Sequence, residues 1–261
     1  MPGRLPTKDD FPSSITLSIT RRKLPAKLSS RISEQEPLTY PAPASQLVTN
    51  VLILLHGLGD TSASFTTLGQ RLSLPETTCI SIQAPKPLPF DLGGFHWGDD
   101  IIFDQATGEM DVDTGFKSST RIVLDEVIRK GLVEKCCYKP REIMIFGFAQ
   151  GGMVGLQVAA EIELGGVISI GGTISSSIPF AALDKKSRTP VIVCKGSKNS
   201  AVTSSAIQKI KDIFEFVEIK EWKKIGDGMP SNRDEMLPIM QFFARRLRSM
   251  KGVPEGSVEL T

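Results

Sequence analysis

The fold is decided by the stretch Ile143-Met144-Ile145-Phe146-Gly147-Phe148-Ala149-Gln150-Gly151-Gly152. Its first four residues are apolar, which is typical of a buried strand. The glycines of its second half allow a sharp turn and let two backbone segments approach closely. A helical pattern begins at Gln150 and continues to Ile162. The stretch therefore predicts a strand that turns abruptly into a helix, with Ala149 at the corner.

Short apolar runs alternate with longer helical patterns from Leu47 onward. This alternation predicts an α/β fold, with a mostly parallel central sheet and helices on both faces. The expected strands are Val51–Leu55, Cys79–Gln83, Ile143–Phe146, Val167–Ile170, Val191–Cys194 and Val217–Trp222. The expected helices are Ser64–Leu72, Thr114–Val133, Gln150–Ile162, Ser204–Phe214 and Asn232–Arg248.

Three parts are expected along the 261 residues. Residues 1–48 form an N-terminal extension with possible edge strands at Ile15–Ile19 and near Leu38–Tyr40. Residues 49–249 form the α/β domain, and residues 250–261 form a flexible tail. The last helix ends in Arg245-Arg246-Leu247-Arg248, where positive charge suits the negative end of the helix dipole.

Composition excludes several functional classes. The 31 Lys and Arg residues nearly balance the 29 Asp and Glu residues, so a nucleic-acid partner is not expected. No apolar run approaches the roughly 20 residues that span a bilayer, and the charged N-terminus does not resemble a secretory signal. We therefore expect a cytoplasmic protein, with the nucleus as a further possible compartment.

The four cysteines form no Cys-x-x-Cys pair and have no histidine cluster beside them, which predicts no metal site. No motif for a cofactor is present. Cys79 and Cys194 lie in apolar runs and are expected to be buried free thiols.

Three motifs together resemble the phospholipase/carboxylesterase family, which includes the acyl-protein thioesterases. They are Leu54-Leu55-His56-Gly57-Leu58-Gly59-Asp60-Thr61, Ala84-Pro85 with the later Trp97, and the corner from Gly147 to Gly152. The resemblance extends from about Val51 to Leu247. It implies an α/β-hydrolase fold for residues 49–249 and hydrolysis of carboxylic esters or thioesters, including lysophospholipids and acylated cysteines.

The catalytic triad of that family is altered at all three matching positions. Ala149 stands where the corner carries the nucleophilic serine. Asn199 stands where the orienting carboxylate is expected, and Asp227 stands where the histidine base is expected. The two histidines, His56 and His96, lie far from that position in the sequence. Loss of the serine or the histidine costs on the order of 10⁶ in turnover, so we expect a catalytically silent member.

The backbone parts of the site are retained in the sequence. The N–H groups of Leu58 and Gln150 are candidates for an oxyanion or ligand-binding site. His56 and Trp97 are further candidates for this site. His56 belongs to the oxyanion loop and is expected to fix that loop by hydrogen bonds, and Trp97 lies on a loop that borders the substrate groove in the resembled family. The glycines of the corner have an alternative explanation, because close packing of strand and helix alone would require them.

Two readings are open for the charges near Asp227. A salt bridge from Asp227 to Lys195 or Lys198 would close the former catalytic cleft. Alternatively, all three charges are solvated and have no fixed partner.

Three functions follow from these residues. The leading interpretation is a silent family member that binds an acyl or lipid ligand, an acylated protein or another protein partner. The alternative is an active ester or thioester hydrolase with an unconventional site, for which His96 with Asp99 or Asp100 is a candidate. The third is a structural interaction module whose groove is filled by its own side chains.

Overall fold

The computed structural model describes residues 3–21, 48–103, 110–111, 113–175 and 185–249. Within them a seven-stranded sheet has the order β1-β3-β2-β6-β7-β8-β9. The strands are β1 (Leu17–Arg21), β2 (Asn50–Leu55), β3 (Thr77–Ile82), β6 (Ile143–Phe148), β7 (Gly166–Ile170), β8 (Val191–Lys198) and β9 (Val217–Ile225). Every neighbouring pair is parallel except β1 and β3. The predicted α/β class with a mostly parallel sheet is confirmed.

The N-terminal edge strand predicted at Ile15–Ile19 is present as β1, two residues further along the chain. It pairs antiparallel with β3, with Leu17 opposite Ile82. The second predicted edge strand, near Leu38–Tyr40, and the tail at 250–261 lie outside the described residues.

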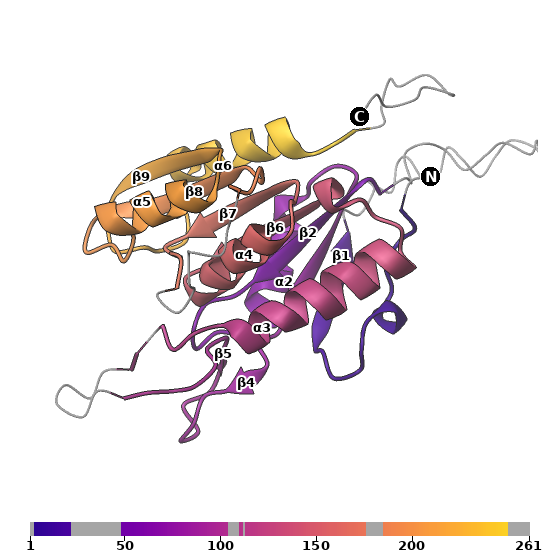
Figure 1. The fold of residues 1–261 in the computed structure, drawn as a ribbon, viewed down its shortest axis with the longest axis horizontal. Coiled ribbons are helices and arrows are strands. Elements are labelled where there is room, and N and C mark those ends of the chain that lie inside the picture. Colours follow the sequence, from indigo (N-terminus) through magenta and orange to yellow (C-terminus); the bar gives the residue numbers. More distant parts are fainter. Residues whose placement is uncertain (1–2, 22–47, 104–109, 112, 176–184, 250–261) are drawn as a thin grey trace, which may run out of the picture.

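Helices cover both faces of the sheet, as predicted (Figure 1). They are α2 (Ser62–Leu72), α3 (Lys117–Arg121), α4 (Gln150–Glu161), α5 (Ser204–Ile213) and α6 (Arg233–Arg246). The helix that begins as α3 continues with π-type hydrogen bonding as η3 (Ile122–Lys135), and short 3₁₀ turns lie at η1 (Lys8–Asp10) and η4 (Pro140–Glu142). No helix in the described ranges is long and apolar enough to cross a membrane.

Successive residues of β2 divide the core into two layers. Val51, Ile53 and Leu55 pack in the layer that contains η3, α4 and α5. Leu52 and Leu54 pack in the layer on the other face, with side chains of α2 and α6. All six residues of β2 are buried, which is typical of a central parallel strand.

The four cysteines are free thiols. Cys79 and Cys194 are buried, as predicted, and burial raises the pKa of each thiol to about 12. These two thiols therefore behave as small apolar side chains of the core.

A short antiparallel hairpin, which the sequence did not predict, follows β3. Its strands are β4 (Lys86–Pro87) and β5 (Phe95–His96), with Lys86 opposite His96. Figure 1 shows the hairpin projecting from the lower end of the molecule, beyond the sheet. It lies at the end of the sheet where β2, β3 and β6 finish, because Gly59 and Asp60, just after β2, bond to Phe95 of β5.

Candidate functional site

The corner between β6 and α4 keeps a strained backbone. Ala149 has φ 45° and ψ −115°, a conformation that residues with a side chain rarely adopt. Two backbone hydrogen bonds hold it there: Ala149 N donates to Ile170 O at 2.8 Å, and Met153 N donates to Ala149 O at 3.0 Å. The sharp turn that exposes a nucleophile is thus present, but it carries a methyl group.

Close packing accounts for the glycines of the corner. A Cβ added to Gly151 would lie 2.5 Å from His56 O and still closer to Leu55 O. A Cβ added to Gly147 would in turn collide with the backbone of Gly151. The end of β2 and the start of α4 therefore touch through their backbones, and the packing explanation for these glycines is sufficient.

His56 is buried and saturated with hydrogen bonds. Its Nδ1 donates to Gly57 O at 2.7 Å, and its Nε2 accepts from Ala84 N at 3.0 Å. Burial lowers the pKa of the imidazole, so the ring is held neutral. As expected, His56 fixes the loop after β2.

Trp97 is completely buried beside His56, with ring centroids 5.4 Å apart. Its indole Nε1 donates to His56 O at 2.8 Å, and its backbone N donates to the side-chain Oε1 of Gln150 at 3.0 Å. Both candidates for the ligand-binding site, Trp97 and His56, are buried. Through these hydrogen bonds they join the loop after β2 to the first residue of α4.

The two amides expected at an oxyanion site have different surroundings. The Leu58 N–H has no hydrogen-bond acceptor among the described residues, whereas the next amide, Gly59 N, donates to Phe95 O at 2.9 Å. Gln150 is the first residue of α4, where amides point out of the positive end of the helix. Both groups remain suited to an electronegative oxygen.

Asp227 is bound by backbone amides and forms no ion pair within the described residues. Its Oδ1 accepts from Gly196 N at 2.9 Å, and its Oδ2 accepts from Ala201 N at 2.7 Å. Lys195 instead pairs with Glu221 at 3.3 Å, because β8 and β9 place these two residues opposite each other. The predicted salt bridge from Asp227 to a lysine is wrong, and so is the alternative of a solvated Asp227 without a fixed partner.

The loops that carry positions 199 and 227 adjoin, since Gly226 N donates to Lys198 O at 2.8 Å. Asn199 itself is exposed and has a left-handed backbone with φ 51°. In the described part of the chain its side chain forms no hydrogen bond with Asp227. The structure therefore brings these two loops together, without a hydrogen bond between the side chains of Asn199 and Asp227.

Positions 149 and 227 approach the same short segment after β7. A Cβ added to Gly171 would lie 2.5 Å from Cβ of Asp227, and a Cβ added to Gly172 would lie 2.8 Å from Ala149 O. Ala149, Asn199 and Asp227 thus belong to one neighbourhood at the carboxyl end of the sheet.

In the candidate centre at His96, neither Asp99 nor Asp100 forms a hydrogen bond with the His96 ring within the described residues. Asp100 Oδ1 accepts from Ile101 N at 2.8 Å. The carboxylate of Asp99 accepts from Lys117 N at 2.7 Å and Ser118 N at 2.8 Å, so it serves the start of α3. His96 is buried, its Nδ1 has no partner among the described residues, and burial lowers its pKa. No hydroxyl or thiol bonds to its ring there, and no group of three His, Cys, Asp or Glu in the same residues could hold a metal ion.

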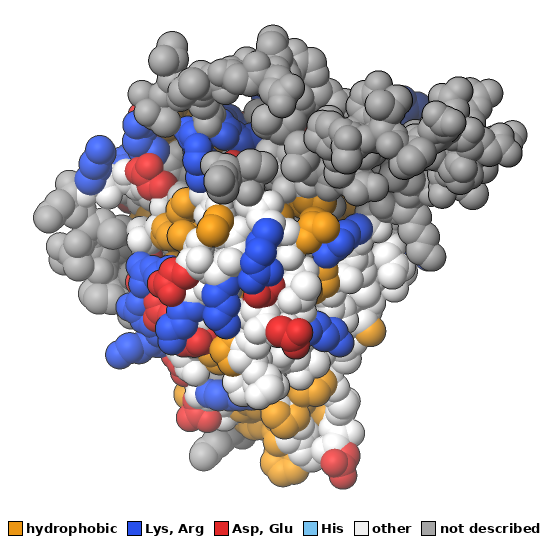
Figure 2. Space-filling view, turned by 90° about the vertical axis from the view of Figure 1, so that its right-hand side faces the viewer, with side chains coloured by type: hydrophobic (Ala, Val, Ile, Leu, Met, Phe, Trp, Pro, Cys, Tyr) orange, Lys and Arg blue, Asp and Glu red, His pale blue; other side chains and the backbone are white. Residues whose placement is uncertain are grey.

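A mainly apolar pocket of about 530 Å³ lies along the β4–β5 hairpin, and sequence reasoning did not locate it. The ring centroids of Phe90 and Phe103 lie 6.2 Å apart, and both side chains are exposed. Figure 2 shows hydrophobic side chains gathered at the lower end of the molecule, where the hairpin projects. The pocket is lined by Lys86, Pro87, Leu88, Pro89, Phe90, His96, Asp99, Asp100, Ile101 and Phe103.

Comparison with known proteins identifies relatives of this chain. A family model described as phospholipase/carboxylesterase matches residues 42–247. An uncharacterized hydrolase of Schizosaccharomyces pombe is 28% identical over 226 residues, covering 82% of this chain and 90% of the relative. Acyl-protein thioesterase 1 of Saccharomyces cerevisiae is 26% identical over 226 residues, covering 78% and 96%. The crystal structure of esterase PE8 shares the fold with TM-score 0.64 at 21% identity, covering 78% of this chain and 95% of that one.

Proposed function

Because this chain belongs to the phospholipase/carboxylesterase family, we propose that it is a catalytically silent member that binds an acyl or ester group. The observation that carries the proposal is the corner at Ala149, which keeps the strained backbone of a nucleophile without the nucleophile. Asp227 supports it, because both of its carboxylate oxygens already accept backbone N–H groups. Such a site lacks a group that attacks a carbonyl and a base that activates the attack.

The retained amides suggest how a ligand is held. A carbonyl or carboxylate oxygen placed between Leu58 N and Gln150 N would find donors of the kind that stabilise an oxyanion. Without a triad, donors and binding together supply about 10³–10⁴-fold acceleration over water. That residual rate does not support ordinary turnover, so the proposed outcome is binding.

The pocket along the β4–β5 hairpin supports an apolar ligand. Its volume of about 530 Å³ lies within the range of small-molecule sites, and Phe90 and Phe103 line it. Its His96 directly precedes Trp97, whose backbone N–H bonds to Gln150 at the corner. The name of the yeast relative, acyl-protein thioesterase 1, suggests the acyl chain of a lipid or of an acylated protein as the ligand class.

The first experiment measures turnover on the full chain. Short- and long-chain p-nitrophenyl esters and an S-palmitoylated peptide serve as substrates, and a fluorophosphonate probe reports any activated serine. We expect no turnover above buffer and no labelling. Robust hydrolysis that is lost on mutating another residue, such as His96, would establish the competing function of an unconventional hydrolase.

The second experiment measures binding through the melting temperature in palmitate. A ligand that binds only the folded state raises that temperature, and the shift grows with the logarithm of the ligand concentration relative to Kd. We expect stabilisation that Phe90→Ser weakens and that Leu237→Ser leaves unchanged, since Leu237 is an exposed apolar residue on α6, away from this pocket. No stabilisation by palmitate would leave a purely structural module as the better account.

Restoration tests the assignment of the three positions. Ala149→Ser alone is expected to give no useful esterase activity, because no base accompanies it. Ala149→Ser combined with Asn199→Asp and Asp227→His is expected to recover some activity. Strong activity from the single change would show that the assignment of the base position is wrong.

A further inference from the structure

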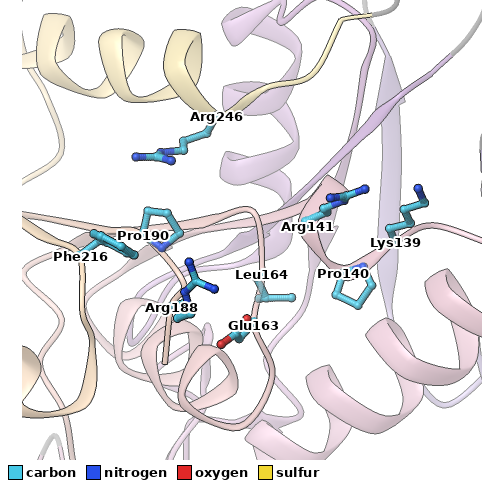
Figure 3. A pocket seen from close by; sticks show the side chains of 9 residues that line it. All are labelled: Lys139, Pro140, Arg141, Glu163, Leu164, Arg188, Pro190, Phe216 and Arg246. Carbon is cyan, nitrogen blue, oxygen red and sulfur yellow. The ribbon is translucent and has the colours of Figure 1, made fainter. Parts of the chain in front are cut away.

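A second pocket lies at the opposite end of the parallel strands, away from the corner. It has a volume of about 650 Å³. Its lining residues directly precede β6, β7, β8 and β9 or lie at the end of α6 (Figure 3). They are Lys139, Pro140, Arg141, Glu163, Leu164, Arg188, Pro190, Phe216 and Arg246.

Positive charge dominates this pocket. Four cationic side chains line it against the single carboxylate of Glu163. The chain as a whole is nearly neutral, with a net charge of +2. The pocket is therefore a local concentration of positive charge, which favours an anionic ligand.

The arginines at the end of α6 differ in their partners. Arg245 pairs with Glu218 at 2.6 Å, and Arg248 approaches Glu142 at 3.8 Å. Arg246 has no carboxylate partner in the described part of the chain, and its buried Nε has no hydrogen-bond acceptor there. The guanidinium lies over the ring of Phe242, 5.8 Å from its centroid, and within the described residues no carboxylate neutralises its charge.

Arg188 faces the same space. In Figure 3 its guanidinium rises from the pocket floor toward the side on which Arg246 extends. Its carboxylate contact is the long one of 3.8 Å to Glu215, between two largely exposed side chains, which constrains it little. Two guanidinium groups thus line the same pocket. The planar fork of each matches the oxygens of a phosphate.

The remaining surface of the pocket is apolar. Leu164 and Pro190 line it, and Phe216, which is 46% exposed, lies beside Pro190 in Figure 3. An aromatic face next to paired arginines suits a ligand that carries both a planar body and a strong negative charge. A phosphomonoester carries a charge of about −1.5 to −2 at pH 7, and so it offsets the excess of cations better than a carboxylate.

We infer that this pocket binds a small phosphorylated organic molecule of nucleoside monophosphate size. Arg188 and Arg246 hold the phosphate, and Phe216 packs against the planar body. The inference is independent of the proposed acyl site, which lies at the other end of the strands.

Calorimetric titration of the full chain tests the inference with adenosine monophosphate, inorganic phosphate and adenosine as probes. We expect the monophosphate to bind more tightly than phosphate, adenosine to bind far more weakly, and added NaCl to weaken binding. Binding of adenosine as tight as that of the monophosphate, or no binding of the monophosphate, would overturn the inference.

Two arginine variants localise the binding. Arg188→Gln and Arg246→Gln are each expected to weaken monophosphate binding by about tenfold or more. Arg246→Lys keeps the charge but loses the planar fork, so an intermediate loss is expected. Arg245→Gln, one residue away and outside the pocket, is the matched control and should bind like the unmutated chain. Unchanged monophosphate binding in both Arg188→Gln and Arg246→Lys would refute the assignment of the ligand to this pocket. This test also holds if the Arg246→Gln variant fails to fold.

A lipid headgroup could present the same phosphate chemistry. Co-sedimentation with phosphatidylcholine vesicles, with and without phosphatidylinositol 4-phosphate, separates the sources. We expect no dependence on the phosphorylated lipid. Vesicle binding that requires this lipid, with no response to the soluble monophosphate, would contradict the assignment to a small soluble ligand.

Discussion

The two ends of the same parallel strands differ in what they offer a ligand. At the carboxyl end, the corner at Ala149 keeps a strained backbone, and His56 and Asp227 are hydrogen-bonded to backbone groups, although His96 Nδ1 has no partner among the described residues. At the amino end, the backbone is ordinary strand, and four cationic side chains line one pocket with the carboxylate of Glu163. Packing alone can require an unusual backbone, as it does at Gly151. Charged side chains gathered around a pocket are therefore the better guide to a ligand.

The strongest test of the packing argument is Gly151→Ala. The added methyl group would overlap the backbone oxygens of Leu55 and His56, which cannot rotate away. We expect a loss of about 3 kcal/mol in the free energy of unfolding, measured by urea denaturation. Gly228→Ala is the control, because its Cβ would meet only the flexible end of Lys224 at 3.8 Å, and it should change stability by less than about 0.5 kcal/mol. Equal effects of the two changes would remove the packing explanation.

Asp227→Asn tests whether this carboxylate now has a structural role. In the variant, the amide oxygen of the asparagine can replace one of the two carboxylate oxygens as an acceptor. The NH₂ group takes the place of the other oxygen, so one donor would face the N–H of Gly196 or Ala201. We expect a loss of about 1–2 kcal/mol in urea denaturation, since hydrogen bonds to a charged acceptor are lost. Asp212→Asn on α5, an exposed carboxylate that accepts from Gln208, should have little effect. A stable Asp227→Asn variant would mean that the loops are held by other contacts.

The fold could be predicted because its strands are short apolar runs buried on both faces. The strand expected at Val51–Leu55 is present as β2 with one added residue, and α4 ends one residue before its predicted boundary. The β4–β5 hairpin was missed because strands of two residues have no periodicity to detect. β8 was predicted to end at Cys194 but continues to Lys198, since Gly196 and Ser197 do not look like strand residues.

The extension of β8 to Lys198 explains why a salt bridge from Asp227 to a lysine was wrongly predicted. The sequence placed Lys195 on a loop facing Asp227, whereas the strand register sets it opposite Glu221. The true partners of Asp227 are backbone amides, which every residue except proline carries and which a sequence therefore does not distinguish. The role of His56 could be predicted because its position after the first strong strand fixes what surrounds it.

Ala149→Gly measures the strain stored at the corner. Glycine adopts φ 45° without the penalty that a side chain brings, although it loses more conformational entropy on folding. We expect a net gain of about 1 kcal/mol in stability, measured by thermal or urea unfolding. Ala159→Gly, in regular α4 helix, should instead lose about 1 kcal/mol or more. If both changes destabilise, the corner is less strained than its angles indicate.

The smallest expected effect is a change of stability with pH, which the buried histidines at the carboxyl end of the strands cause. Burial lowers the pKa of His56 below the value of about 6.5 in an unfolded chain, and it lowers that of His96 in the same direction. The unfolded state therefore binds more protons than the folded state below pH 6.5, so stability is complete above that pH and falls as the pH drops through it. We expect a loss of about 0.5–1 kcal/mol between pH 7.5 and 5.5, measured by urea denaturation.

His96→Gln assigns that pH dependence. What persists in the variant belongs to His56, because the chain has only these two histidines. NMR of the remaining imidazole should show a pKa below that of an unfolded chain, and NaCl should not change the profile, since the neutral ring carries no charge to screen. At the amino end, arginine does not titrate in this range, so phosphate affinity there should respond to NaCl but not to pH between 7.5 and 8.5. A salt-sensitive His56 profile would mean that the ring is charged in the folded chain, and the carboxyl end would then hold a titratable group that its hydrogen bonds do not account for.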